Sequence, residues 1–184
     1  RCPVWMTRGT FDSRRYLFKG PERLRFIEND ETFSVGDLRA RAFAISHDAA
    51  DPVNFVIEDG ETRIAVATDM GTVTPLVLKQ LQGADLVIME SNYDRRMLME
   101  SAYPWHLKQR INSNHGHLAN DASAEALKRL VEGGLDRAVL AHLSEENNRP
   151  GLAVEACRAH LGSLSSRLHL DVAVQNRPTP IFVV

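Results

Sequence analysis

The chain has 184 residues, a formal net charge of −2 and a hydrophobic fraction of 43%, values typical of one globular domain. This charge excludes a general electrostatic attraction to nucleic acid or anionic membranes, so a polyanionic ligand would need a local basic patch. Two cysteines, Cys2 and Cys157, are too few for a disulfide framework or a thiolate zinc site. No apolar run reaches the roughly 20 residues of a membrane span. We therefore expect a cytoplasmic protein without membrane association.

Short β-like runs alternate with helical runs along the chain, and this order predicts one layered α/β domain over residues 1–184. In the first half, strands are expected at residues 24–27, 38–46, 54–58, 63–68 and 85–89. The turn Glu58-Asp59-Gly60-Glu61 predicts a hairpin. A helix is expected at residues 76–81, because Thr74 and Pro75 precede it and Gly83 follows it.

The second half of the chain continues the same alternation. Helices are expected at residues 104–111, 121–131 and 149–164, and strands at residues 137–141, 168–174 and 181–184. The pair Gly133-Gly134 predicts the end of the second of these helices. Residues 34–44 and 168–174 partly alternate in polarity, which is typical of half-buried strands.

Three candidate metal ligands stand at the ends of apolar runs: His47, Asp69 and His142. Zinc centres use histidine nitrogens and carboxylate oxygens, and loops that leave strands hold such groups on rigid backbone. Neighbouring antiparallel strands would bring His47 and Asp69 together. An aspartate in this position can bridge two metal ions, and the hydroxide that the ions share would be the nucleophile. The pattern therefore predicts two divalent ions, zinc in the first place and manganese as the alternative.

Five segments carry a resemblance to a known family: Ser46-His47-Asp48-Ala49-Ala50-Asp51-Pro52, Ala67-Thr68-Asp69-Met70-Gly71, Glu90-Ser91-Asn92-Tyr93-Asp94, Gly116-His117-Leu118-Ala119-Asn120 and Leu140-Ala141-His142-Leu143-Ser144-Glu145-Glu146-Asn147-Asn148. In their order and spacing they resemble the metallo-β-lactamase superfamily and, within it, the YycJ or WalJ branch. The resemblance implies an αββα sandwich with His47, Asp69 and His142 as ligands. The family's His-x-His-x-Asp-His run occurs nowhere in the sequence. We therefore expect an incomplete, N-terminally truncated sandwich that lacks this loop and part of the first β-layer.

The resemblance also implies catalytic roles for His117 and Glu90. His117 would donate the proton that a poor alkoxide leaving group requires, and Glu90 would orient it and stabilise its charge. Ser144, Asn147 and Asn148 follow the last histidine ligand just before a helix, where hydroxyl, amide and backbone N–H groups can hold a phosphate.

The expected activity is that of a metal-dependent phosphodiesterase, since members of the YycJ branch resemble DNA exonucleases that act from 5′ ends. Basic and aromatic residues near the site loops favour a nucleic acid or phosphodiester substrate: Arg95, Arg96, Lys108, Arg110, Tyr93, Tyr103 and Trp105. Two alternatives stay open. The protein is a hydrolase of small thioesters or lactams, or it is a non-catalytic fragment or interaction module because several ligands are absent.

Each candidate also has a purely structural interpretation. Glu90 can form a surface salt bridge with Arg95 or Arg96 instead of serving His117. Three histidines are assigned structural roles: His106, His160 and His169. His115 is expected in a flexible loop rich in Asn and Gly and is not counted as a metal ligand. A missing β-layer would expose apolar surface, which predicts a homodimer or poor solubility.

Overall fold

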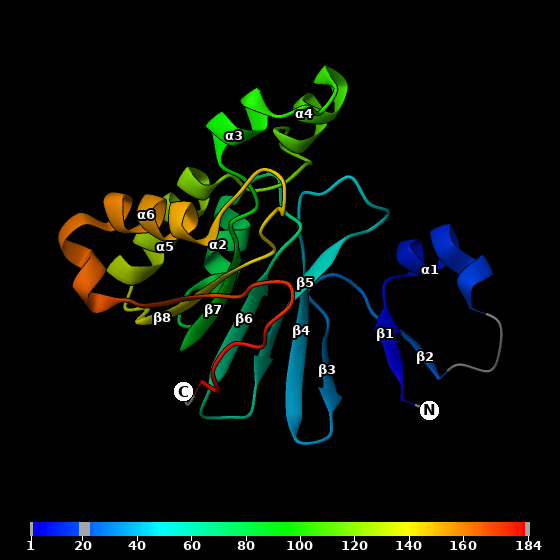
Figure 1. Ribbon diagram of the computed structural model, residues 1–184. Helices are drawn as coiled ribbons and strands as arrows, with labels where there is room; N and C mark the ends of the chain where they lie inside the picture. Colours follow the sequence, from blue (N-terminus) through cyan, green and yellow to red (C-terminus); the bar gives the residue numbers. More distant parts are fainter. Residues whose placement is uncertain (1, 19–22, 183–184) are drawn as a thin grey trace.

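A seven-stranded mixed sheet forms the centre of the computed structural model, which describes residues 2–18 and 23–182 (Figure 1). The strands are adjacent in chain order: β3 (Thr32–Val35), β4 (Leu38–Ala44), β5 (Val53–Glu58), β6 (Arg63–Ala67), β7 (Leu86–Glu90), β8 (Arg137–Ala141) and β9 (His169–Val172). Pairing is antiparallel from β3 to β6 and parallel from β6 to β9. The expected layered α/β fold is confirmed.

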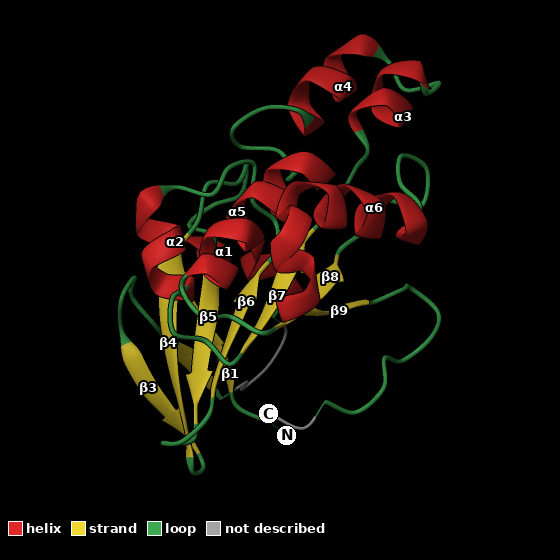
Figure 2. Cartoon of the chain, turned by 90° about the vertical axis from the view of Figure 1, so that its left-hand side faces the viewer, coloured by secondary structure: helices red, strands yellow, loops and turns green. Residues whose placement is uncertain are grey.

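Three helices cover one face of this sheet: α2 (Pro75–Leu81), α5 (Asn120–Glu132) and α6 (Pro150–Leu161) (Figure 2). Sequence signals set their ends. The Thr74 side chain accepts a hydrogen bond from the Val77 amide at the start of α2, and α5 stops at Gly133, as predicted. Leu127 of α5 and Cys157 of α6 pack into the main core against the sheet. Their burial removes apolar surface from water and fixes the helices on this face.

A small helical lobe lies beyond the carboxyl ends of β7 and β8 and consists of α3 (Arg95–Glu100) and α4 (Trp105–Ile111) (Figure 1). Lys108 joins the two helices, since its ammonium group donates hydrogen bonds to the carbonyls of Met99 at 2.6 Å and Ser101 at 2.7 Å. A second apolar cluster lies beneath the lobe and contains Tyr93, Leu98, Ala119, Tyr103 and Ile111. The lobe is therefore held firmly above the sheet edge.

The N-terminal segment forms a separate two-stranded parallel sheet from β1 (Val4–Met6) and β2 (Leu24–Phe26). Between them lie α1 (Arg8–Arg14) and a 3-10 turn (Arg15–Leu17). Aromatic stacking joins this unit to the main sheet, because the rings of Trp5 and Phe33 lie 5.5 Å apart. The Thr7 hydroxyl also donates a hydrogen bond of 2.8 Å to the Asp51 carbonyl.

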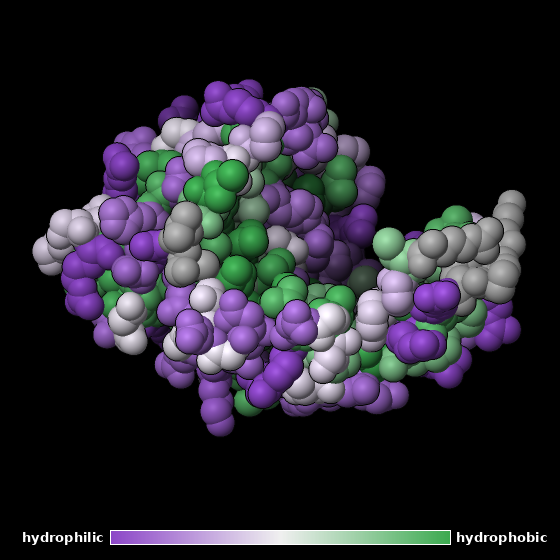
Figure 3. Space-filling model, turned by 90° about the horizontal axis from the view of Figure 1, so that it is seen from below, coloured by the Kyte–Doolittle hydropathy of each residue, from purple (hydrophilic) through white to green (hydrophobic). Residues whose placement is uncertain are grey.

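The second face of the large sheet keeps apolar side chains that are only partly buried. Residues alternate between the two faces of a strand, so the neighbours of the buried core positions point to this second face: Phe55, Ile57, Ile64, Val66 and Ile88. Seen from below, apolar side chains gather in the middle of the main body, and the N-terminal unit projects to one side (Figure 3). Within the described residues, no second large sheet covers this face.

Several elements differ from the sequence-based expectation. Gly36, with φ of +62°, turns the chain within residues 34–44, so that β3 and β4 form a hairpin in place of one alternating strand. The structure adds β1, α1 and α3, which the pattern did not predict. The expected strand at 181–184 is wrong at Ile181 and Phe182, which lie outside any strand, and its last two residues lie outside the described part.

Candidate metal centre

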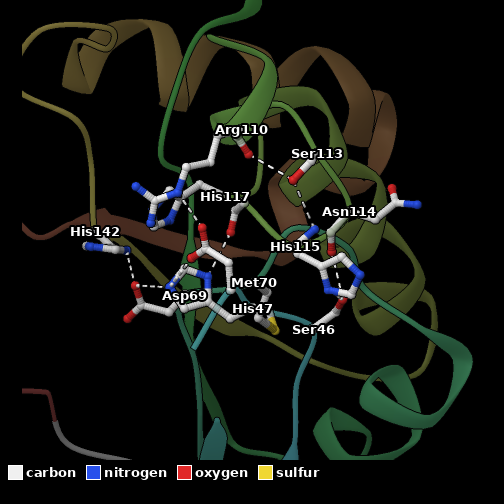
Figure 4. A network of polar contacts seen from close by, with 12 residues as sticks. Ser46, His47, Asp69, Met70, Arg110, Ser113, Asn114, His115, His117 and His142 are labelled. Carbon is white, nitrogen blue, oxygen red and sulfur yellow. Dashed lines mark hydrogen bonds and ion pairs between the residues drawn. The ribbon is translucent and has the colours of Figure 1, made fainter. Parts of the chain in front are cut away.

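Five predicted site residues meet at the sheet edge that faces the α3–α4 lobe. The strands β4, β6, β7 and β8 run in one direction, so their carboxyl ends lie at the same edge. His47 follows β4, Asp69 follows β6, Glu90 closes β7 and His142 follows β8. His117 enters from the loop before α5. Segments that are distant in the sequence therefore supply one cluster of polar side chains (Figure 4).

The Asp69 carboxylate lies between two imidazoles. Its Oδ1 atom is 3.7 Å from Nε2 of His47 and 3.6 Å from Nδ1 of His142. The His117 ring lies against both of the other rings, with centroid distances of 5.1 Å to His47 and 5.1 Å to His142. The three predicted ligands thus converge, and one oxygen of Asp69 is close to a histidine on each side.

Two of these residues adopt a left-handed backbone conformation that is uncommon for residues other than glycine. The φ angles are +56° at Asp69 and +57° at His142. Such a conformation costs about 1–3 kcal/mol and persists where the surrounding structure enforces it, most often at functional sites. Asp69 stands two residues after the end of β6, and His142 directly follows β8. Both side chains point into the cluster (Figure 4).

Glu90 is the buried acceptor of the cluster, with no exposed surface. Its Oε1 atom lies 2.7 Å from Nδ1 of His117 and 3.0 Å from Nδ1 of His142. Its Oε2 atom accepts a hydrogen bond of 2.7 Å from the Met70 amide, next to Asp69. Glu90 therefore contacts residues of three loops, which follow β6, precede α5 and follow β8. The surface salt bridge with Arg95 or Arg96 does not form, since those side chains bind Asp121 and Glu100.

These contacts fix the charge of Glu90 and the tautomers of its partners. Burial raises the pKa of Glu90, but hydrogen bonds from His117, His142 and the Met70 amide outweigh burial, so that the pKa is lowered. The hydrogen bond to Glu90 raises the pKa of His142. An ionised carboxylate only accepts hydrogen bonds, so both Nδ1 atoms carry protons. In the neutral rings the lone pair therefore resides on Nε2, the atom left for a metal or a substrate.

A second loop positions His47. Its Nδ1 atom lies 3.0 Å from the Gly116 carbonyl oxygen, which leaves Nε2 facing Asp69. The Asp48 amide donates a hydrogen bond of 2.8 Å to the His115 carbonyl. Gly71 lets the loop after β6 pass directly against residues 113–114, where a Cβ atom would overlap backbone atoms. Close backbone packing therefore joins the loops that carry His47, Asp69 and His117.

One ion pair at this edge of the sheet was not predicted from the sequence. Arg110 of α4 binds the carboxylate of Asp48, and the hydrogen bond from Arg110 lowers the pKa of Asp48 although burial raises it. Asp48 also lies 3.6 Å from Nε2 of His47. The signal was present in the sequence, because Asp48 belongs to the segment that resembles the family, but nothing local to it indicated a partner 62 positions later.

The predicted phosphate-binding residues lie beside the cluster with different exposures. Ser144 is half-buried and its hydroxyl accepts a hydrogen bond of 3.1 Å from the Asn147 amide. Asn147 and Asn148 are almost completely buried. The Asn148 side chain donates hydrogen bonds to the carbonyls of Ser91 and Asn92 and exchanges hydrogen bonds with the Asn120 amide. Asn148 therefore ties β7, α5 and α6 together, and its contact with a phosphate stays a prediction.

The expected basic and aromatic surface is smaller than the sequence indicated. Tyr93 is 2% exposed and its hydroxyl binds Asn112, so its ring offers no face for stacking. Lys108 is buried and used by backbone carbonyls. Tyr103 is half-buried, whereas Trp105 is 64% exposed. His115 lies in the loop before the cluster, and its Nδ1 atom is 3.0 Å from the Ser46 hydroxyl.

The donor set fits divalent metal ions. Two overlapping groups offer ligand atoms within 4.8 Å of one another: His47, Asp69 and His117 in one, and Glu90, His117 and His142 in the other. Imidazole nitrogens and carboxylate oxygens suit zinc, and the same atoms accept manganese. Asp69 and His142 add a close contact between the two groups. The two groups share His117.

Comparison with known proteins identifies the family. A family model described as a beta-lactamase superfamily domain matches residues 3–143. The chain belongs to this superfamily. Exodeoxyribonuclease YycJ of Bacillus anthracis is 33% identical over 153 residues, which cover 82% of this chain and 58% of that protein. The chain thus spans little more than half the length of this relative. The predicted resemblance to the YycJ branch is confirmed.

Solved structures place the chain in the metallo-β-lactamase fold. The metallo-β-lactamase fold protein YhfI of Bacillus subtilis superimposes with a TM-score of 0.70 at 13% identity, over 93% of this chain and 60% of YhfI. Zn²⁺-bound PqqB of Methylobacterium extorquens has a TM-score of 0.64 at 20% identity, over 93% of this chain and 62% of PqqB. The superfamily relatives include a named exodeoxyribonuclease. In the described part of the chain, no helix has the length and hydrophobicity that a bilayer crossing requires.

Proposed function

We propose that the protein is a metal-dependent phosphodiesterase that degrades DNA as an exonuclease. The observation that carries the proposal is the convergence of His47, Asp69 and His117, whose ligand atoms lie within 4.8 Å of one another, with the His142 ring next to Asp69. A carboxylate in this position can join two metal ions. The similarity to an exodeoxyribonuclease supports DNA as the substrate.

The proposed metal ligands are His47, Asp69 and His142. They would share two divalent ions, zinc in the first place, which the Zn²⁺-bound neighbour PqqB and the nitrogen-rich donor set support. Manganese is the alternative. When bound, such ions supply a hydroxide near neutral pH and stabilise the negative charge of a phosphoryl group under attack. His142 would use its Nε2 atom, because Glu90 holds its Nδ1 proton.

Glu90 and His117 are proposed to serve the leaving group. The Glu90 carboxylate holds the Nδ1 proton of His117 at 2.7 Å, so the ring is fixed and its Nε2 atom is free to carry a proton. A proton on Nε2 can be donated to a departing alkoxide. The Ser144 hydroxyl lies on the loop after His142, where it is proposed to contact a phosphate oxygen, together with Asn147 and Asn148 as predicted partners.

The test uses the protein at its natural length, because this chain spans 58% of the relative that it matches. Zinc- or manganese-loaded protein is expected to release nucleotides from DNA ends. The variant Asp69→Asn, which removes the anionic oxygen between His47 and His142, is expected to lose metal and activity together. Metal-loaded protein that releases no nucleotide would refute the proposal.

The role of His117 has a separate test. His117→Ala is expected to slow the cleavage of DNA by roughly 10²–10⁴-fold, the usual contribution of a general acid. The loss should be much smaller with bis-p-nitrophenyl phosphate, whose nitrophenolate leaves without a proton. Equal losses on both substrates would contradict the assignment. The alternative function would be favoured if His117→Ala hydrolysed small thioesters or lactams at the wild-type rate and the protein had no phosphodiesterase activity.

The cellular setting follows from the same proposal. Cys2, which is exposed, and Cys157, which is buried, are both free thiols. Free thiols support a reducing compartment such as the cytoplasm.

The homodimer predicted from the sequence stays a prediction, and sedimentation of the purified protein tests it.

A further inference from the structure

A cavity of about 450 Å³ opens directly beside the candidate metal centre. It lies between α4 and the loop that follows His142, and it is named the α4 pocket after that helix. Its lining includes Tyr103, Leu107, Arg110 and Ile111 on the lobe side, and His117 and His142 at its inner end. A group that occupies the pocket therefore lies next to the two imidazoles that Glu90 orients.

The α4 pocket has an apolar wall with a fixed shape. Tyr103 and Ile111 pack against the cluster of Tyr93, Leu98 and Ala119, so they cannot move without disturbing buried contacts. All three cluster residues are at most 2% exposed. Leu107 lies on the same side of the pocket, one helical turn from Ile111. A flat aromatic ligand can be received here without a large rearrangement.

The opposite wall and the mouth are polar. The opposite wall consists of Leu143, Ser144 and Glu145, and Gln175 of the C-terminal segment also lines the pocket. Hydrogen-bond donors and acceptors therefore face the apolar wall. Arg110 stands at the mouth, where its guanidinium group binds Asp48 and remains 66% exposed (Figure 4). A phosphate can approach this guanidinium from the solvent side.

We propose that the α4 pocket holds the nucleobase of the nucleotide whose phosphate lies at His117 and His142. The inference rests on the proposed function and specifies its substrate site. Ligand pockets of roughly 300–1,000 Å³ take one small molecule, so a cavity of about 450 Å³ has room for one nucleotide. The terminal base of DNA therefore leaves its stack before cleavage.

A second cavity near His117 fits this role less well. That cavity of about 400 Å³ lies under α5, and its lining includes Arg95, Glu125 and Arg129 but not His142. The α4 pocket, in contrast, joins an aromatic and aliphatic wall to both imidazoles. Stacking on side chains such as Tyr103 tolerates every base, since each base has a π-face, so the pocket would read the presence of a base rather than its identity.

The test compares two ligands that differ only in the base: 2′-deoxyadenosine 5′-monophosphate and 2-deoxyribose 5-phosphate. Calorimetric titration of the protein at its natural length is expected to give an affinity at least about tenfold higher for the nucleotide, the usual scale of base stacking on a side chain. Leu107→Ala and Leu143→Ala, on opposite walls, are each expected to reduce this ratio by about threefold or more.

Trp105→Ala is the matched control, because Trp105 belongs to the same helix, is 64% exposed and does not line the pocket. It should leave the ratio unchanged. Equal binding of the two ligands, or binding of neither, overturns the inference, as does a loss of the ratio in Trp105→Ala with none in the two leucine variants. A protein that prefers the nucleotide but cleaves no DNA refutes the proposed function alone, whereas DNA cleavage without the preference refutes the pocket alone.

Discussion

Oε1 of Glu90 lies 2.7 Å from Nδ1 of His117, and Glu90 is completely buried. The same oxygen also serves His142, and the second oxygen serves the Met70 amide. All three groups that reach Glu90 are N–H donors, so the side chain at this position must only accept hydrogen bonds. This requirement separates Glu90 from an ordinary buried acid and makes it the residue that sets the orientation of two imidazoles.

Glu90→Gln is expected to weaken metal binding by roughly 10–100-fold, the usual effect of removing a group that orients metal ligands. A glutamine has the same shape, but its NH₂ group must face either the Met70 amide or the two imidazole N–H groups, and a donor then faces a donor. Competition with a chromophoric chelator measures the affinity. Glu100→Gln, an exposed partner of Arg96, is the control. Unchanged affinity in Glu90→Gln would show that Glu90 does not orient the ligands.

Asn148→Ala is expected to lower the free energy of unfolding by about 3 kcal/mol. The side chain donates to the buried Ser91 carbonyl and accepts from the Asn120 amide NH₂ group, whereas the Asn92 carbonyl keeps the Ser144 amide as a donor. The Ser91 carbonyl and the Asn120 NH₂ group thus lose this partner, and each buried polar group left without a partner costs roughly 1–3 kcal/mol. Urea denaturation measures the change. Asn176→Ala, at an exposed position, should have no effect. A stability loss below about 1 kcal/mol would mean that water replaces the Asn148 contacts.

The sequence placed the three proposed ligands at one edge of the sheet because their signal is local. His47, Asp69 and His142 each follow an apolar run, and the direction of the strands brings the ends of such runs to one edge of the sheet. The same reasoning gave α2 and α5 within one or two residues, since a capping threonine and a glycine pair mark their ends. Local patterns therefore predicted the layered fold and the convergence of these three side chains, and their role as metal ligands stays a prediction.

The remaining errors concern contacts between distant residues. Arg95 and Arg96 follow Glu90 closely in sequence, yet α3 turns them away to Asp121 and Glu100, and Glu90 is left to the histidines. The sequence also did not predict that the Asn148 amide pairs with Asn120 across 28 positions, and the contact of Asn148 with a phosphate stays a prediction. Such pairings depend on how α5 and α6 pack, which no short pattern records.

The two thiols are expected to react at very different rates. Burial raises the pKa of Cys157 to about 11, and its side chain is 1% exposed, so almost no accessible thiolate exists at pH 8. Cys2 is exposed. Titration with Ellman's reagent should detect Cys2 rapidly in the native chain and Cys157 only after denaturant is added. Rapid reaction of Cys157 in a Cys2→Ser variant would indicate that α6 separates readily from the core.

Gly71→Ala is expected to destabilise the chain by about 1–3 kcal/mol, the usual cost of overpacking. A Cβ atom at this position would overlap the Asn114 carbonyl carbon and the Ser113 carbonyl oxygen, and neither is a flexible side-chain end that can move aside. The displaced loop carries the carbonyl that holds His47, so metal affinity should fall with stability. Gly151→Ala is the control, because a Cβ atom there meets nothing within 4 Å and alanine favours the helix. Thermal unfolding with and without zinc compares the two variants. If Gly71→Ala unfolds at the wild-type temperature and keeps its zinc affinity, the contact between the Asp69 loop and residues 113–114 does not position the metal ligands.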